Sequence, residues 1–140
     1  MRFWDSSAVA PLLVDEPARQ GILDILKADG GLIVWWGTPV ECASAIARRE
    51  REGDLAPGEA NAALDRLRAI EPSWAEVSPS PRVRGYALRL LRVHALTSSD
   101  SLQLAAALVA AEQEPANLGF VCLDERLSTA AQREGFTVVP

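Results

Sequence analysis

The sequence contains little cysteine and little histidine. Its two cysteines, Cys42 and Cys122, lie far apart, and their spacing matches neither a disulfide framework nor a zinc motif. We therefore expect both to be small buried residues of a protein in a reducing compartment. The one histidine, His94, lies near the end of a predicted helix. It could act as a general base, but we favour a packing role at the helix end.

Long apolar runs and an excess of positive charge are also missing. The longest apolar tract, Leu102 to Ala111, contains Gln103 and is too short to span a bilayer. Asp5 interrupts the N-terminus before a secretory signal could form. We therefore expect a cytoplasmic protein without a membrane segment. The net charge of −5 argues against binding nucleic acid by bulk electrostatics, although acids grouped at one site would mask local basic patches.

Strand-like and helix-like patterns alternate along the chain, without repeats or an obvious linker. We expect strands at 2–4, 32–36, 74–77, 120–123 and 136–139, and helices at 7–14, 16–28, 39–52, 57–70, 82–94, 100–112 and 125–134. The length of 140 residues fits a single domain, 1–140. Strands separated by helices predict an α/β fold, a three-layer α/β/α sandwich around a mostly parallel sheet.

Two acids directly follow predicted strands. Asp5 ends the first strand, and Asp124 ends the fourth. Parallel strands are apolar because both of their faces are covered, so an acid is expected only where the strand leaves the sheet. Ligands of open α/β sheets bind at that edge. The alternative for both acids is a role as N-cap of the helix that follows.

Two further acids lie at predicted helix starts. Glu41 fits a capping box with Thr38 as N-cap, and it falls off the expected apolar stripe of Val40, Ala43, Ile46 and Ala47. Asp100 lies four and eight residues before Leu104 and Leu108, on the expected packed face of a very apolar helix. Because an unpaired buried aspartate is costly, Asp100 needs a positive partner, for which a metal ion is a candidate.

Together, the four acids predict a metal site at one edge of the sheet. Carboxylates that converge repel one another by a few kcal/mol per pair at about 4 Å and an effective dielectric constant of about 20. A hard divalent cation would remove that repulsion. Oxygen ligands without Cys or His suit Mg²⁺ or Mn²⁺ rather than zinc. Phosphodiester hydrolysis is the chemistry that uses such a site.

At these residues the chain resembles the PIN-domain ribonucleases, and most closely the small VapC-type toxins of bacterial type II toxin–antitoxin pairs. The resemblance extends nearly from end to end and depends on the order and spacing of all four acids. The matching segments are Phe3-Trp4-Asp5-Ser6-Ser7-Ala8-Val9, the helical Glu41, Asp100-Ser101-Leu102-Gln103-Leu104-Ala105-Ala106-Ala107, and Val121-Cys122-Leu123-Asp124 followed by Gly135-Phe136.

The resemblance implies a PIN-like fold and a function. It implies that Asp5, Glu41, Asp100 and Asp124 form the catalytic metal site of an Mg²⁺-dependent endoribonuclease, with Mn²⁺ as a possible substitute. It also implies a cognate antitoxin whose segment covers the acidic groove, and a homodimer. One departure concerns Cys122, because the family often has a small hydroxyl residue two positions before the last acid.

Other residues have secondary roles in this interpretation. Ser7 is expected to support the site by hydrogen bonding, and candidates for RNA phosphate contacts are Arg48, Arg82, Arg89 and Arg92. A solvated helix face is the alternative for these arginines. Two other functions remain open. One is a PIN-like interaction module without metal. The other is an aspartate-based phosphoryl-transfer domain, which would want an acid where Ser7 stands.

Overall fold

Five strands form one parallel sheet in the computed structural model, which describes all 140 residues from Met1 to Pro140. The strands are β1 Arg2–Trp4, β2 Leu32–Trp35, β3 Ala75–Val77, β4 Gly119–Val121 and β5 Thr137–Val139. Their order in the sheet is β3-β2-β1-β4-β5, and all four neighbouring pairs are parallel. The first strand of the chain is therefore the central one, between β2 and β4.

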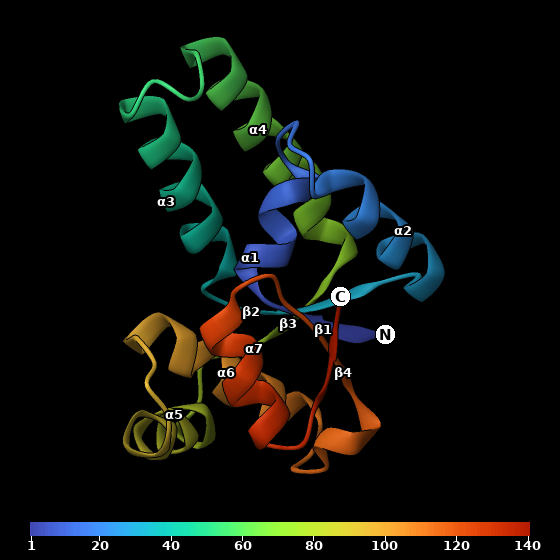
Figure 1. Ribbon diagram of the computed structural model, residues 1–140, viewed down its shortest axis with the longest axis vertical. Helices are drawn as coiled ribbons and strands as arrows, with labels where there is room; N and C mark the ends of the chain where they lie inside the picture. The colour runs from blue at the N-terminus through green and yellow to red at the C-terminus, as the bar shows by residue number, and fades with distance from the viewer.

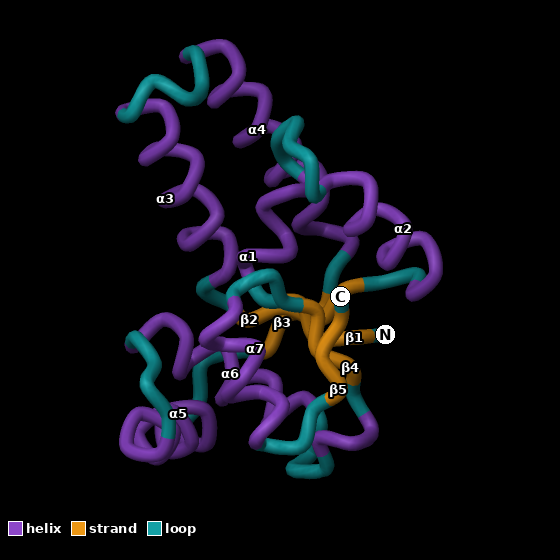
Figure 2. Tube along the Cα trace, in the orientation of Figure 1, coloured by secondary structure: helices purple, strands orange, loops and turns teal.

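Seven α-helices cover the two faces of this sheet (Figure 1). One face carries α1 Ser6–Val9, α2 Arg19–Asp29, α3 Thr38–Arg51 and α4 Pro57–Ile70, and the other carries α5 Pro81–Val93, α6 Ser98–Ala110 and α7 Glu125–Arg133. Figure 2 shows the strands as a thin layer between the two groups. The predicted three-layer α/β/α sandwich is thus confirmed. None of the helices is long and apolar enough to cross a membrane.

Side chains alternate between two hydrophobic cores because successive residues of a strand point to opposite faces. Phe3 and Phe120 pack against α5, α6 and α7, with their ring centroids 5.5 Å apart. Trp4 and Val121, the next residues along the two strands, pack in the core under α1 to α4. Burial on both faces explains why these strands read as continuous apolar runs.

The connections that follow the neighbouring strands β1 and β4 go to opposite faces of the sheet. The chain leaves β1 into α1 on one face, and it leaves β4 into α7 on the opposite face. The backbone N–H of Asp5 donates to the carbonyl of Val121 at 3.0 Å, which holds the two strand ends together. Ligands of open α/β sheets bind at such a switch point, outside the carboxyl ends of the strands.

Several helix boundaries differ from the predicted ones, and prolines explain two of them. The helix expected at 7–14 ends at Val9 and continues as a 3₁₀ turn over Ala10–Leu12, which contains Pro11. The helix expected from Glu16 begins at Arg19, because a residue before a proline, here Pro17, disfavours helical backbone angles.

Two other predictions of local structure were wrong. Thr38 is the first residue of α3 rather than its N-cap, which is Gly37. Val40, expected on the packed stripe of that helix, is 69% exposed, whereas Cys42 and Ile46 are buried. The packed face of α3 therefore differs from the predicted one, and on the observed face Glu41 contacts α1 and α6.

Candidate functional site

Asp5 is a buried acid with one oxygen left without a partner. It is only 2% exposed and caps α1, because its Oδ2 accepts a hydrogen bond from the backbone N–H of Ser7 at 3.0 Å. Its Oδ1 is buried and has no hydrogen-bond partner. Burial raises the pKa of Asp5, and the nearby Asp100 raises it further against the opposing hydrogen bonds from Ser7. Such an unpartnered buried oxygen is one that a cation would satisfy.

Cys122 contacts the same oxygen of the Asp5 carboxylate as the backbone N–H of Ser7. Its Sγ donates to Asp5 Oδ2 at 3.7 Å and lies 3.7 Å from Ser7 Oγ. Burial raises the pKa of the Cys122 thiol to about 12, and Asp5 adds to this, so the sulfur keeps its proton and can donate. Ser7 Oγ in turn accepts from the backbone N–H of Leu123. The thiol thus makes a contact with the first acid from the position where a hydroxyl was expected.

Glu41 links three helices. Its Oε1 accepts from Ser6 Oγ of α1 at 3.0 Å, and its Oε2 accepts from Gln103 Nε2 of α6 at 3.0 Å. Burial raises the pKa of Glu41 to about 7, since the charges of Asp5 and Asp100 add to it and the two hydrogen bonds only partly oppose it. The capping-box alternative for this residue was wrong, because neither Oε atom accepts from the start of α3.

Asp100 and Asp124 lie at the solvent side of the same site. Asp100 is half-buried in the first turn of α6, and none of the six ion pairs in the protein includes it. Asp124 is exposed and caps α7 through a hydrogen bond from the backbone N–H of Leu127 to its Oδ1 at 2.8 Å. The capping alternatives for Asp5 and Asp124 are therefore observed, and each cap leaves one carboxylate oxygen free.

All four acids line one pocket of about 460 Å³, which we call the acidic pocket. Its wall also includes Ser6, Ser7 and Arg48. No three of the His, Cys, Asp and Glu side chains lie close enough together to hold a single metal ion in this arrangement. The four carboxylates would have to move closer together to share one ion. The oxygen-only ligand set and the unpartnered Asp5 Oδ1 fit a hard cation such as Mg²⁺.

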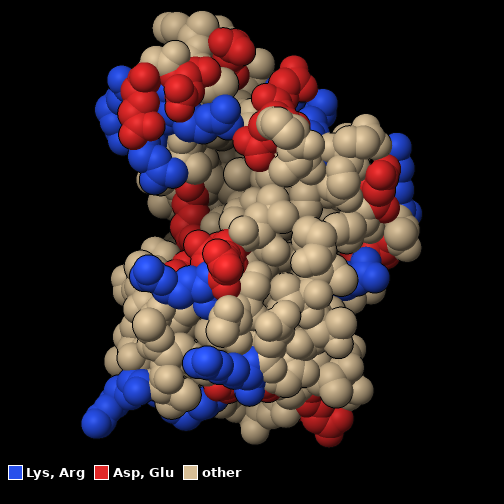
Figure 3. Space-filling view, in the orientation of Figure 1, with Lys and Arg blue, Asp and Glu red and all other residues tan.

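The surface around the acidic pocket alternates in charge. Figure 3 shows acidic side chains in the indentation between α3 and the α6–α7 region, with basic side chains above and below them. Of the arginines considered from the sequence, Arg48 lines the acidic pocket. The other three, on α5, do not line it, and Arg89 is paired with Glu134 at 2.9 Å.

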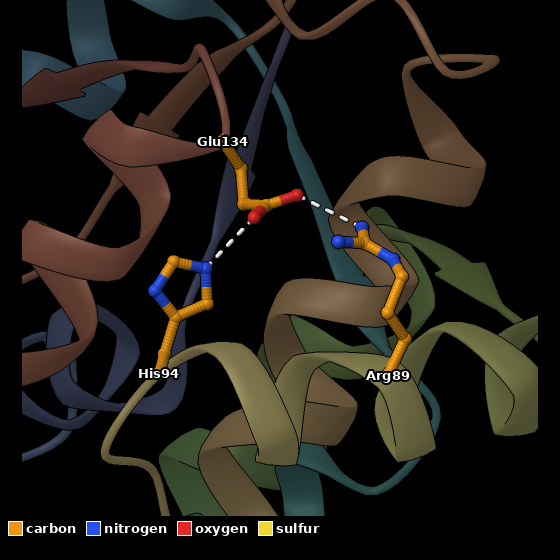
Figure 4. Close-up of polar contacts among 3 residues, drawn as sticks. All are labelled: Arg89, His94 and Glu134. Atoms are coloured by element: carbon orange, nitrogen blue, oxygen red, sulfur yellow. Dashed lines mark hydrogen bonds and ion pairs between the residues drawn. The ribbon is translucent and has the colours of Figure 1, made fainter.

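His94 belongs to a polar network outside the acidic pocket (Figure 4). Its side chain is 4% exposed, and its Nε2 lies 2.7 Å from Glu134 Oε2, while Arg89 donates to Glu134 Oε1. Burial by itself raises the pKa of Glu134, but the hydrogen bonds and charges of Arg89 and His94 outweigh it and lower the pKa. The network ties the end of α5 to the end of α7, a packing role.

Two residues of the site had not been singled out from the sequence. Ser6 holds Glu41 from α1, and Gln103, which is fully buried, donates from α6 both to Glu41 and to Thr38 Oγ1 at 3.0 Å. The signal for Gln103 was its presence inside an otherwise apolar run, since a buried amide needs partners. Ser6 gave no such signal.

Replacing Gln103 by methionine should raise the pKa of Glu41 above its present value of about 7. The amide hydrogen bond favours the charged carboxylate, and methionine keeps the side-chain volume without donating. NMR titration of the Glu41 carboxyl carbon measures the effect, with Gln132→Met, an exposed glutamine on α7, as the matched control. A pKa at or below 7 in the variant would remove Gln103 from this role.

No protein-family model matches the sequence, and no curated protein matches it. Solved structures share its fold. The crystal structure of PAE2754 from Pyrobaculum aerophilum matches with a TM-score of 0.67 and 22% identity, over 99% of this chain and 83% of that one. A toxin–antitoxin complex from Klebsiella pneumoniae matches with a TM-score of 0.67 and 13% identity, over 100% and 97%. FitAcB from Neisseria gonorrhoeae matches with a TM-score of 0.67 and 17% identity, again over 100% and 97%.

Proposed function

We propose that this chain is a metal-dependent endoribonuclease of the PIN type that acts as the toxin of a toxin–antitoxin pair. The observation that carries the proposal is the convergence of Asp5, Glu41, Asp100 and Asp124, far apart in the sequence, on one pocket at the switch point of a parallel sheet. One of the structures with this fold is a toxin–antitoxin complex, which supports the biological role. We propose a cognate antitoxin on the same ground, and a homodimer from the resemblance of the sequence to PIN-domain toxins.

Hydrogen bonds from neighbouring residues would position the carboxylates for binding a metal ion and a phosphodiester. Mg²⁺ or Mn²⁺, when bound, would activate water and neutralise charge on the phosphoryl group. Asp5 presents its Oδ1 to the pocket, while Ser7 and Cys122 fix its Oδ2. Ser6 and Gln103 fix the two oxygens of Glu41. One half of the site is therefore held by hydrogen bonds, and the half-buried Asp100 and the exposed Asp124 form its adjustable half.

An RNA cleavage assay tests the proposal. We expect the purified chain to cut single-stranded RNA internally in the presence of Mg²⁺ or Mn²⁺, and EDTA to stop the reaction. The products are separated on a denaturing gel over a time course, with heat-denatured protein as the control for contaminating nuclease. If the RNA stays intact with either metal, and the protein used shows a normal melting transition, the chain is not a nuclease.

A metal-free interaction module is the second candidate, and one observation favours it. The four acids line the pocket without three of them converging on one point. Calorimetric titration with Mn²⁺ separates the two functions, because a nuclease should release heat on binding the ion with a defined stoichiometry. If the chain neither binds Mn²⁺ nor cuts RNA, we would conclude that it is a metal-free interaction module.

A further inference from the structure

A second pocket continues the acidic pocket along α7. It has a volume of about 670 Å³ and is lined by residues of α7 and of the segment between α5 and α6. We call it the α7 pocket. Asp100 and Asp124 line both pockets, so the two pockets adjoin at these acids, and together we call them the groove. The groove runs from α3 across the four acids to the far end of α7.

Arginines stand at both ends of this groove. Arg48 of α3 lines the acidic pocket, and Arg126 and Arg133 of α7 line the α7 pocket. None of the three takes part in an ion pair, whereas Arg19, Arg49, Arg68 and Arg89 all do. Figure 3 shows the resulting order of charge, with basic side chains on both sides of the acidic indentation.

The placement of Arg126 on α7 is unfavourable for the helix itself, whereas Arg133 lies in the last turn, where the helix dipole favours a cation. Arg126 lies in the first turn, where the helix dipole disfavours a cation. Arg133 follows seven residues later, two turns along the same face, which is about 10 Å. That distance exceeds the rise of about 3.4 Å per nucleotide along a strand, so the two cations would meet different phosphates. The network of Arg89, His94 and Glu134 holds α7 in this position (Figure 4).

The lining of the α7 pocket suits a phosphate backbone rather than bases. Only two of its ten lining residues are hydrophobic, and none is Phe, Tyr or Trp. Proteins that stack bases of a single strand use such aromatic side chains, whereas backbone contacts come from arginine and lysine. Asp100, Asp124 and Glu125 also line the pocket and would repel phosphate, so binding should depend on a divalent cation as well.

We propose that the α7 pocket binds the phosphates of a single-stranded RNA next to the one that is cut, through Arg126 and Arg133. The proposal rests on the proposed nuclease function, which supplies the RNA and the position of the reacting phosphate. It replaces the arginines of α5 as the main phosphate contacts, because Arg82 and Arg92 line neither pocket. Binding through this pocket is independent of base sequence.

The experiment compares Arg126→Ala/Arg133→Ala with Arg82→Ala/Arg92→Ala. Arg82 and Arg92 are exposed and form no ion pair, so their double variant removes the same charge elsewhere. All proteins carry Glu41→Gln to prevent cleavage. Fluorescein-labelled oligo-uridine and oligo-adenosine are titrated in MgCl₂ at several NaCl concentrations, and anisotropy gives the Kd. A further double variant, Arg126→Lys/Arg133→Lys, retains the charge.

For the α7 double variant we expect about 5-fold weaker binding per arginine for both oligonucleotides. The slope of log K against log salt should become shallower by about 1.4, which is about 0.7 per lost contact to a single strand. The lysine variant should keep the slope, and the α5 double variant should match the parent. A merely structural role for the arginines would not change the slope.

Equal Kd and equal slope in the α7 double variant and its parent would overturn the proposal and assign these arginines to another ligand, such as an acidic protein segment. An equal loss in the α5 double variant would overturn it as well. If the alanine variant unfolds, Arg126→Gln/Arg133→Gln provides the same comparison. Failure of the wild-type chain to cut RNA would contradict the proposed function, while the binding comparison would still decide the role of the arginines.

Discussion

Replacing Asp5 by asparagine should slow RNA cleavage by about 10³-fold or more and leave the fold intact. The substitution removes the charge of the one carboxylate of the acidic pocket that has a buried oxygen without a hydrogen-bond partner. A metal ion at a phosphoryl group is worth several kcal/mol, which corresponds to a rate factor of about that size. Asparagine is as good an N-cap as aspartate, so α1 should still begin at Ser6.

The measurement is the single-turnover rate with Mg²⁺, and Asp100→Asn should show a loss of similar size. Asp54→Asn is the matched control, because Asp54 lies exposed between α3 and α4, outside the pockets of the groove. Without metal, Asp100→Asn should melt no lower than the wild type, since it relieves repulsion with Asp5 and Glu41. Activity equal to that of Asp54→Asn would remove these acids from the mechanism, and a clearly lower metal-free melting temperature would indicate a structural role.

Without metal, the protein should lose stability as the pH rises from about 4.5 to above 7. Glu41 has its pKa raised from 4.5 to about 7, so in this window the unfolded chain has released a proton that the folded chain still holds. Stability therefore falls with rising pH, and the loss is complete above the folded pKa. Because Glu41 is partly exposed, we discount the shift for solvent screening and expect a loss of about 1–2 kcal/mol. The raised pKa of Asp5 acts in the same direction.

The comparison of wild type with Glu41→Gln isolates this effect from the other titrating groups. At pH 8 without metal, the variant should melt about 5 °C higher, and at pH 4.5 the two should melt together. Mg²⁺ should raise the melting temperature of the wild type more at pH 8 than at pH 5.5, because the ligands must be deprotonated. Thermal unfolding by circular dichroism in EDTA and in MgCl₂ gives all these values. If the wild type instead becomes more stable than Glu41→Gln as the pH rises, burial does not destabilise the charged form of Glu41, and the prediction is wrong.

The sequence predicted the sheet well because its strands are short apolar runs that end on an acid or at a turn. The same pattern located Asp5 and Asp124, whose positions follow from where β1 and β4 leave the sheet. The orientation of α3 was not predictable, since its apolar residues permit more than one packed stripe. Only contact with α1 and α6 shows that Glu41 points inward and Val40 outward.

The residues that hold and flank the acids were harder to predict than the acids themselves. Gln103 and Ser6 act through side-chain hydrogen bonds between helices distant in the chain, and no spacing rule encodes such pairs. In the sequence, nothing distinguishes Arg126 and Arg133 from the other arginines. Only the fold shows that they line a pocket together with Asp100 and Asp124. Conversely, Arg89 resembled a phosphate contact in its helical context but is paired with Glu134, 45 residues away.

The central position of β1 has a consequence for the order of events during translation. The ribosome releases β1 and Asp5 first, yet one neighbour of that strand, β4, and the acid after it, Asp124, are made more than a hundred residues later. A growing polypeptide therefore lacks both the wall of the groove and its last carboxylate until Asp124 and α7 have been synthesised. If the chain cuts RNA, a nascent copy that has not yet reached Asp124 lacks part of the site and should be inactive toward the transcript that encodes it.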